Sequence, residues 1–171
     1  SDIRPYNDDE IPAALERIVN DPFFVPAVNF AFPEADMERI REVVRTCKTV
    51  DQMQQRVMFS IIQRIIETTI DNFTSSGVEH IEKGKGYLYI SNHRDIVLDS
   101  GLLDMLLFAQ MGLNTVEIAI GDNLLIYPWI KTLVRLNRSF IVTRKGGIRE
   151  MLQSSIRLSS YMHYVIGEKK Q

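Results

Sequence analysis

The stretch that decides the fold is residues 86–120, which read GYLYISNHRDIVLDSGLLDMLLFAQMGLNTVEIAI. Its first six residues, Gly86–Ser91, are mostly apolar and aromatic, which predicts a β-strand. Asp99–Met111 then places leucines three and four positions apart and ends before Gly112, which predicts a helix. Thr115–Ile120 is rich in β-branched residues and predicts a second strand. A strand, a helix and a strand in this order are typical of parallel strands joined by a right-handed crossover.

The alternation of helices and strands continues along the chain. Asn123–Leu136 predicts a second helix, which Pro128 kinks or restarts. Ser139–Thr143 predicts a third strand, and Ile148–His163 predicts a last helix after two glycines. We therefore expect an α/β domain in residues 78–171, with an incomplete, mostly parallel β-α-β-α-β sheet flanked by helices.

A helical amino-terminal region, residues 1–77, is expected to precede this domain. It holds five of the six prolines, all within residues 1–35, which argues against long helices there. Four segments are expected: a short helix at Pro12–Asn20, an extended apolar arm at Phe23–Phe32, a helix at Met37–Cys47 and a long helix at Val50–Thr74.

Composition excludes several classes of protein. The chain has 20 Lys and Arg against 22 Asp and Glu, a net charge of −2, which argues against a dedicated nucleic-acid binder. It has no run of about 18 or more apolar residues, so no membrane-spanning helix is expected. The single Cys47 cannot form an internal disulfide, and no His and Cys cluster has metal-ligand spacing. We expect a cytoplasmic protein without a bound metal.

The residues that could carry chemistry follow the first predicted strand. His93 lies where that strand ends, the edge at which ligands bind α/β sheets. A histidine there can accept a proton and return it, and a carboxylate on its other ring nitrogen would orient it. Asp95 and Asp99 are both near enough in sequence to do so. The alternative interpretation is that His93 is an ordinary loop residue and Asp99 only caps a helix.

Basic residues gather further along the chain. Residues 131–149 hold six of them and no acid. This asymmetry indicates either an anionic partner or a solvated basic face.

The segment Asn92–Asp99 resembles the first motif of the glycerolipid acyltransferases, which include glycerol-3-phosphate and 1-acylglycerol-3-phosphate acyltransferases. That motif is Asn-His, four residues, then Asp. The segments Pro128–Lys131 and Ser139–Arg144 resemble the second motif, a hydrophobic strand closed by a basic residue. The resemblance covers about residues 80–160 and rests on the order and spacing of the two motifs.

The resemblance implies an acyltransferase of phospholipid synthesis. His93 would deprotonate a hydroxyl of a phosphorylated glycerol-type acceptor, which would attack the thioester of acyl-CoA or acyl-carrier protein; no further cofactor is implied. The implied substrate-binding residues are Asn92, Arg94, Arg138, Arg144 and Lys145. Arginine suits the acceptor phosphate because its planar fork gives paired, charge-assisted hydrogen bonds. Lipid products also imply peripheral contact with the inner face of a membrane.

Three departures from the family pattern bear on this interpretation. Five residues, not four, separate His93 from Asp99, so either Asp99 reaches back or Asp95 orients the ring; we favour Asp99. Residues 137–139 lack the glycine that often precedes the second-motif strand. The later Glu-Gly-x-Arg and proline-containing blocks are absent, so we expect an amino-terminal portion of a longer enzyme, which need not be active alone. The alternative function is a non-catalytic module that binds lipid or a partner protein on the same scaffold.

Overall fold

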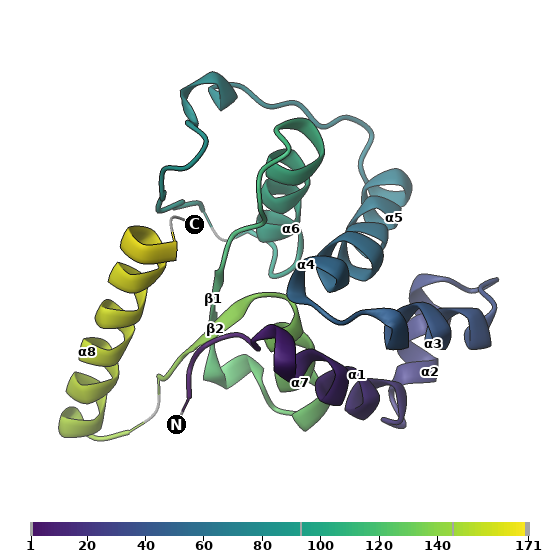
Figure 1. Ribbon diagram of the computed structural model, residues 1–171, viewed down its shortest axis with the longest axis horizontal. Coiled ribbons are helices and arrows are strands. Elements are labelled where there is room, and N and C mark those ends of the chain that lie inside the picture. Colours follow the sequence, from purple (N-terminus) through teal and green to yellow (C-terminus); the bar gives the residue numbers. More distant parts are fainter. Residues whose placement is uncertain (1, 93, 145, 170–171) are drawn as a thin grey trace.

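The computed structural model describes residues 2–92, 94–144 and 146–169 (Figure 1). Its α-helices are α1 (Ile11–Val19), α2 (Phe24–Ala31), α3 (Met37–Thr46), α4 (Val50–Met53), α5 (Phe59–Thr69), α6 (Leu98–Met105), α7 (Pro128–Leu136) and α8 (Ile148–Tyr164). Its strands are β1 (Ile118–Gly121) and β2 (Ser139–Val142). π-helical turns lie at Gln54–Met58, Leu106–Gln110 and Val165–Lys169, and 3₁₀ turns at Asp8–Glu10, Val78–His80 and Asp122–Leu124.

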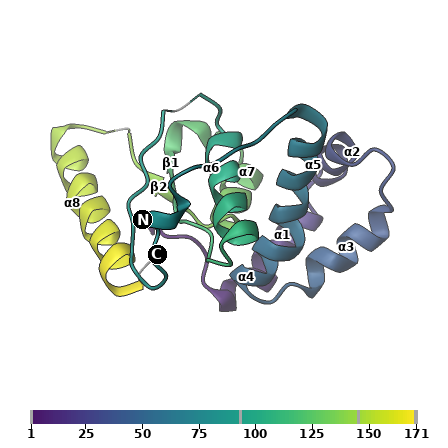
Figure 2. The ribbon, with the colours of Figure 1, turned by 90° about the horizontal axis from the view of Figure 1, so that it is seen from above.

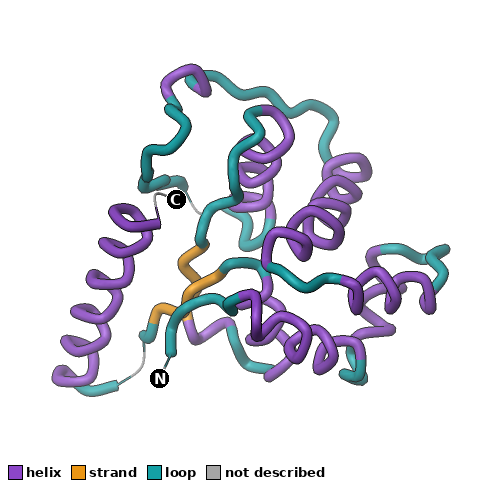
Figure 3. The backbone as a smooth tube through the Cα atoms, in the orientation of Figure 1, coloured by secondary structure: helices purple, strands orange, loops and turns teal. Residues whose placement is uncertain are grey.

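The sheet is small and parallel. Ile118 of β1 pairs with Ser139 of β2, and the register continues to Gly121 and Val142. Helix α7 makes the crossover and starts at Pro128 rather than at the expected Asn123, because proline lacks only an amide that the first turn leaves unpaired anyway. Figure 3 shows the two strands at the centre of the molecule with helices on both sides. The described part of the chain is therefore mostly helical around a two-stranded parallel sheet, which agrees with the α/β class but is not the full β-α-β-α-β sheet that was expected.

The expected first strand at residues 86–91 is wrong: these residues form no strand. Their alternation is real, since Leu88 and Ile90 are exposed while Tyr87 and Tyr89 are partly buried with their rings 6.1 Å apart. Pairing needs a partner strand about 4.8 Å away. Here a pocket lies between this segment and β1 and is lined by residues of both. The alternating pattern of residues 86–91 therefore indicates a half-buried extended chain and not a strand paired in a sheet.

The expected extended arm at Phe23–Phe32 is also wrong, because most of it is helix α2. Pro26 stands in the first turn of α2, where its missing N–H breaks no hydrogen bond. The predicted long helix at Val50–Thr74 is present but ends at Thr69 and contains the π-helical turn at Gln54–Met58. That turn buries Gln54, whose side chain donates to Asn137 Oδ1 at 3.1 Å.

The main hydrophobic core joins the amino-terminal helices to α7. Leu136 of α7 is fully buried with Ile11 and Leu15 of α1, and burial of each such side chain stabilises the fold by about 1.5–3 kcal/mol. Cys47 lies in the same cluster as a free thiol. Figure 2 shows these helices on one side of the sheet and α8 on the other.

The first residues of the chain lie along β2 and α7. Ile141 N donates to Ile3 O at 2.8 Å, and Tyr6 N donates to Arg135 O at 3.3 Å. Arg135 Nε donates to Arg4 O at 2.9 Å, and its guanidinium lies 4.2 Å from the centre of the Tyr6 ring. This amino-terminal segment therefore covers the free edge of β2.

Candidate active site

The loop between residues 92 and 98, which we call the motif loop because it holds most of the Asn92–Asp99 motif, leads into α6. His93 and Lys145, both expected at the site, lie outside the described residues. Asn92, Arg94 and Asp95 are exposed, whereas Asp99 is partly buried in the first turn of α6.

The two aspartates of the loop have different backbone partners. Asp95 Oδ1 accepts hydrogen bonds from Val97 N at 2.8 Å and Leu98 N at 2.7 Å, the pattern of a carboxylate that caps a helix start. Asp99 Oδ2 instead reaches back to Arg94 N at 2.8 Å and Asp95 N at 3.2 Å. The Asp99 carboxylate is thus fixed beside the backbone of the residue that directly follows His93.

A close helix contact sets the position of α6. Gly101, one turn after the motif loop, faces Ile62 of α5, and a Cβ atom at Gly101 would lie 2.8 Å from Ile62 Cδ1. The absence of a side chain lets α5 and α6 approach at this point. The helix that carries Asp99 is therefore positioned by the amino-terminal helices.

Arg144 approaches the carboxyl end of β1. A Cβ atom on Gly121, the last residue of β1, would lie 3.0 Å from Arg144 Nε and 2.5 Å from Asn123 Oδ1. The Arg144 backbone is fixed by a hydrogen bond of 3.1 Å from its N–H to Asp122 Oδ1. Gly121 and Asp122 are not among the site residues predicted from the sequence, although a glycine and an acid directly after a predicted strand were a usable signal.

Asp95, Asp99 and Arg144 line one pocket of about 630 Å³, which we call the β1 pocket. Its walls come from the 87–91 segment, the motif loop, β1 and the end of α8. Its other lining residues include Tyr87, Tyr89, Ser91, Ser100, Glu117, Gly121 and Phe140. The structure thus brings together two predicted acids and one predicted arginine at the carboxyl end of β1, where ligands bind α/β folds.

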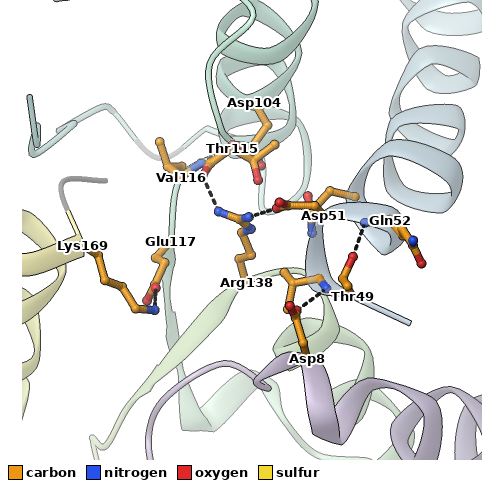
Figure 4. Close-up of polar contacts among 12 residues, drawn as sticks. Asp8, Thr49, Asp51, Gln52, Asp104, Thr115, Val116, Glu117, Arg138 and Lys169 are labelled. Carbon is orange, nitrogen blue, oxygen red and sulfur yellow. Dashed lines mark hydrogen bonds and ion pairs between the residues drawn. The ribbon is translucent and has the colours of Figure 1, made fainter. Parts of the chain in front are cut away.

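Arg138, predicted to hold substrate, lies elsewhere. It directly precedes β2 whereas Arg144 follows it, so a strand rising about 3.3 Å per residue separates them. Its side chain is 9% exposed, its Nη1 donates to Thr115 O at 3.2 Å, and its Nη2 forms an ion pair with Asp51 (Figure 4). Its guanidinium is therefore occupied within the fold, at the opposite end of β2 from Arg144.

A smaller cavity of about 250 Å³, the α6 cavity, lies beside the motif loop between α5 and α6. Ile96, Val97 and Ser100 line it near the loop, and its other walls are mainly apolar. Asp104 of α6 also lines it and accepts a hydrogen bond of 2.8 Å from Val116 N. Burial raises the pKa of the Asp104 carboxyl to about 7, against the opposing effects of that hydrogen bond and the Arg138 charge.

A second polar cluster attaches the end of α8 to the chain before β1. Lys169 Nζ donates to Glu117 Oε1 at 2.7 Å (Figure 4). The Tyr161 hydroxyl donates to Glu117 Oε2. Burial, together with the neighbouring Glu117 carboxylate, raises the pKa of Tyr161. These contacts fix the wall of the β1 pocket that α8 contributes.

Within the described ranges, no group of three or more His, Cys, Asp or Glu side chains could hold a metal ion. Over the same ranges, no helix combines the length and the apolar character needed to cross a bilayer.

Comparison with curated proteins and with solved structures gave no match. A comparison with protein families matched residues 72–170 to the Acyltransferase family. The match includes the motif loop, β1, β2 and Arg144, which are the elements that build the β1 pocket. The chain therefore belongs to the Acyltransferase family.

Proposed function

We propose that this protein transfers a fatty acyl group from acyl-CoA or acyl-carrier protein to a hydroxyl of a glycerol-phosphate-type acceptor. The observation that carries the proposal is the β1 pocket, in which Asp99 of the motif loop and Arg144 lie around the carboxyl end of β1. The Asp99 carboxylate suits an imidazole partner and the Arg144 guanidinium suits a phosphate. Both belong to a chain of the Acyltransferase family.

His93 acts as the general base in this proposal. Its imidazole takes the proton of the acceptor hydroxyl as the oxygen attacks the thioester carbonyl carbon. The tetrahedral intermediate then expels the thiolate, the C–S bond breaks, and the imidazolium returns the proton to sulfur. Asp99 stabilises the imidazolium and holds the ring in one tautomer. Asp99 is favoured over Asp95 because its carboxylate accepts from the backbone N–H of Arg94, the residue after His93, whereas Asp95 Oδ1 caps the start of α6.

Arg144 is the proposed phosphate ligand. Its guanidinium lies over Gly121 without a side chain between it and the strand end, and the β1 pocket provides room for the acceptor. Arg138 is left out of the proposed site because it pairs with Asp51. Asn92, Arg94 and Lys145 remain proposed substrate-binding residues on the strength of their sequence positions.

The α6 cavity is the proposed place for the acyl chain. It borders the motif loop at Val97, and its apolar walls come mainly from α5, β1 and α7, among them Ile62, Ile118 and Leu133. An acyl chain there would be shielded from water, with its thioester at the motif loop, where the acceptor hydroxyl attacks. We also propose that the enzyme works in the cytoplasm at the inner face of a membrane, where the exposed Ile126 and Tyr127 provide apolar contact.

Thiol release by the full chain tests the proposal. Acyl-CoA or acyl-carrier protein is mixed with glycerol 3-phosphate or 1-acylglycerol 3-phosphate, and free thiol and lipid product are both measured. We expect acceptor-dependent turnover that His93→Ala lowers by about 10²–10⁴-fold. His80→Ala is the matched control, since that side chain is 82% exposed and outside the motif.

Equal rates for wild type and His93→Ala would overturn the catalytic proposal. Acyl-CoA binding without turnover by either protein would favour the non-catalytic lipid-binding module instead.

A further inference from the structure

A larger pocket of about 650 Å³ lies among the amino-terminal helices, away from the motif loop. We call it the α2 pocket, because Phe24, Val28 and Ala31 of α2 form one wall. Val44 of α3, Val57 of the π-helical turn and Trp129 of α7 lie on other walls. Among its described lining residues, none belongs to the loop that carries His93.

The chemistry of the α2 pocket suits an apolar chain. Its walls are aliphatic and aromatic side chains over most of their surface, and its volume lies within the range of about 300–1,000 Å³ typical of ligand sites. Phe23 and Trp129 close one side as a stacked pair with ring centres 5.9 Å apart. A ligand without a long apolar part would leave these apolar side chains exposed to water.

Two arginines of the α2 pocket could bind an anionic end on that chain. Arg39 and Arg56 line the pocket, and neither forms an ion pair with a described carboxylate. The rim acids Asp21 and Asp36 are each held at a helix start: Asp21 accepts from Phe23 N at 2.9 Å and Asp36 from Glu38 N at 3.0 Å. Those amides and the positive helix ends offset the aspartate charges. Glu34 is the remaining acid.

We propose that the α2 pocket binds a single-chain lipid with an anionic head, its chain among the apolar side chains and its head on Arg39 and Arg56. A fatty acid and a lysophosphatidate share this chemistry. The α2 pocket shares no described lining residue with the β1 pocket. It does adjoin the α6 cavity, because Ile61 and Leu133 line both. Binding here does not require the proposed acyl transfer to be correct.

Trp129 provides the readout. It is the only tryptophan in the chain and lines the α2 pocket, but neither the α6 cavity nor the β1 pocket. Bromine atoms on a lipid chain quench indole fluorescence only at short range. The full chain is titrated below the critical micelle concentration with 9,10-dibromostearic acid, with its neutral methyl ester, and with a lysophosphatidate that carries the same brominated chain.

We expect saturable quenching of Trp129 by at least one of the two anionic lipids, and the tighter one identifies the head. The double variant Arg39→Gln and Arg56→Gln should weaken that lipid about tenfold and leave the methyl ester unchanged. Arg64→Gln is the matched control, because Arg64 is exposed on α5 and does not line the pocket. Val28→Phe, which fills the pocket, should abolish quenching while circular dichroism shows an unchanged fold.

His93→Ala separates this proposal from the catalytic one, because it should quench like wild type. Absence of saturable quenching by both anionic lipids in the folded protein would overturn the proposal. Equal loss of affinity for the acid and the methyl ester in the double arginine variant would do the same.

Discussion

The guanidinium of Arg138 and the carboxylate of Asp51 form an ion pair that joins the residue before β2 to the first turn of α4. The two partners differ in environment, since the Arg138 side chain is 9% exposed and that of Asp51 is 59% exposed. Arg138 also has a positive φ of 52°, a conformation that few residues adopt without a compensating contact. The pair therefore holds a desolvated cation between the amino-terminal helices and the sheet.

Asp51→Ala should destabilise the protein because it leaves this cation buried without its partner. Loss of one member of a fully buried pair costs about 3–5 kcal/mol, and the exposure of Asp51 reduces the expected loss to about 1–3 kcal/mol in the free energy of unfolding. Urea unfolding measures it. Asp71→Ala, at an exposed position, should change the free energy of unfolding by less than about 0.5 kcal/mol.

An unchanged KM for the acceptor in Asp51→Ala would agree with Arg138 being outside the substrate site. A raised KM with unchanged stability would contradict it.

Gly121→Ala tests the proposed phosphate site without removing a charge. The new Cβ atom would lie 2.5 Å from Asn123 Oδ1 and 3.0 Å from Arg144 Nε, so the guanidinium must shift. The backbone at Gly121 is extended, with φ −71°, and accepts alanine without strain. We expect the acceptor KM to rise about tenfold with little change in kcat. Gly167→Ala, with open space around its Cβ position, should leave the KM unchanged; equal values in both variants would argue against Arg144 as the phosphate ligand.

Asp99→Asn and Asp95→Asn separate the two loop acids. Asparagine keeps an oxygen acceptor, so the hydrogen bonds of Asp99 to Arg94 N and of Asp95 to Leu98 N can persist in the respective variants. We expect Asp99→Asn to lower kcat by about 10²–10⁴-fold and to shift the acidic limb of the pH–rate profile to lower pH, since the imidazolium loses its anionic partner. Asp95→Asn should remain close to wild type, because asparagine is as good a helix cap. The reverse order of effects would make Asp95 the positioning residue.

Asp104 should make the stability of the protein depend on pH near neutrality. Its pKa is about 7 in the folded state, above the ordinary value of 3.8, so the folded state holds this proton to higher pH than the unfolded state does. The contribution of this group to the free energy of unfolding is therefore full below about pH 4 and falls as the pH rises to about 7. Asp104→Asn should remove that fall and gain at least about 1 kcal/mol relative to wild type at pH 8 compared with pH 5. Parallel stability curves for the two proteins would show that Asp104 titrates normally.

Much of the helical structure could be predicted from periodicity. The apolar spacing from Met37 to Val44 gave α3, and Pro128 marked the start of α7, because both signals act within one or two turns. The prolines predict an extended arm where α2 forms, because that rule overlooks that Pro26 occupies a first-turn position, which tolerates proline. The 86–91 segment was assigned to a strand because alternation is local, but a ladder requires a partner that local sequence does not specify.

The candidate site shows the same limit. The motif loop and Arg144 were predicted and line one pocket, since the ends of parallel strands meet at one edge of a sheet. Arg138 was grouped with Arg144 because both belong to one basic run, yet a strand runs between them and carries them to opposite ends. The partner of Arg138, Asp51, is 87 residues away in sequence, a separation that no local pattern reveals.

The amino-terminal segment that covers β2 has a consequence for biosynthesis. The carbonyl of Ile3 is synthesised long before the amide of Ile141 that it binds, so this contact cannot form until residues 4–140 have been made. Contacts between such distant parts of a sequence form late and slowly. The edge of β2 therefore stays open to pairing with another chain until this late contact forms.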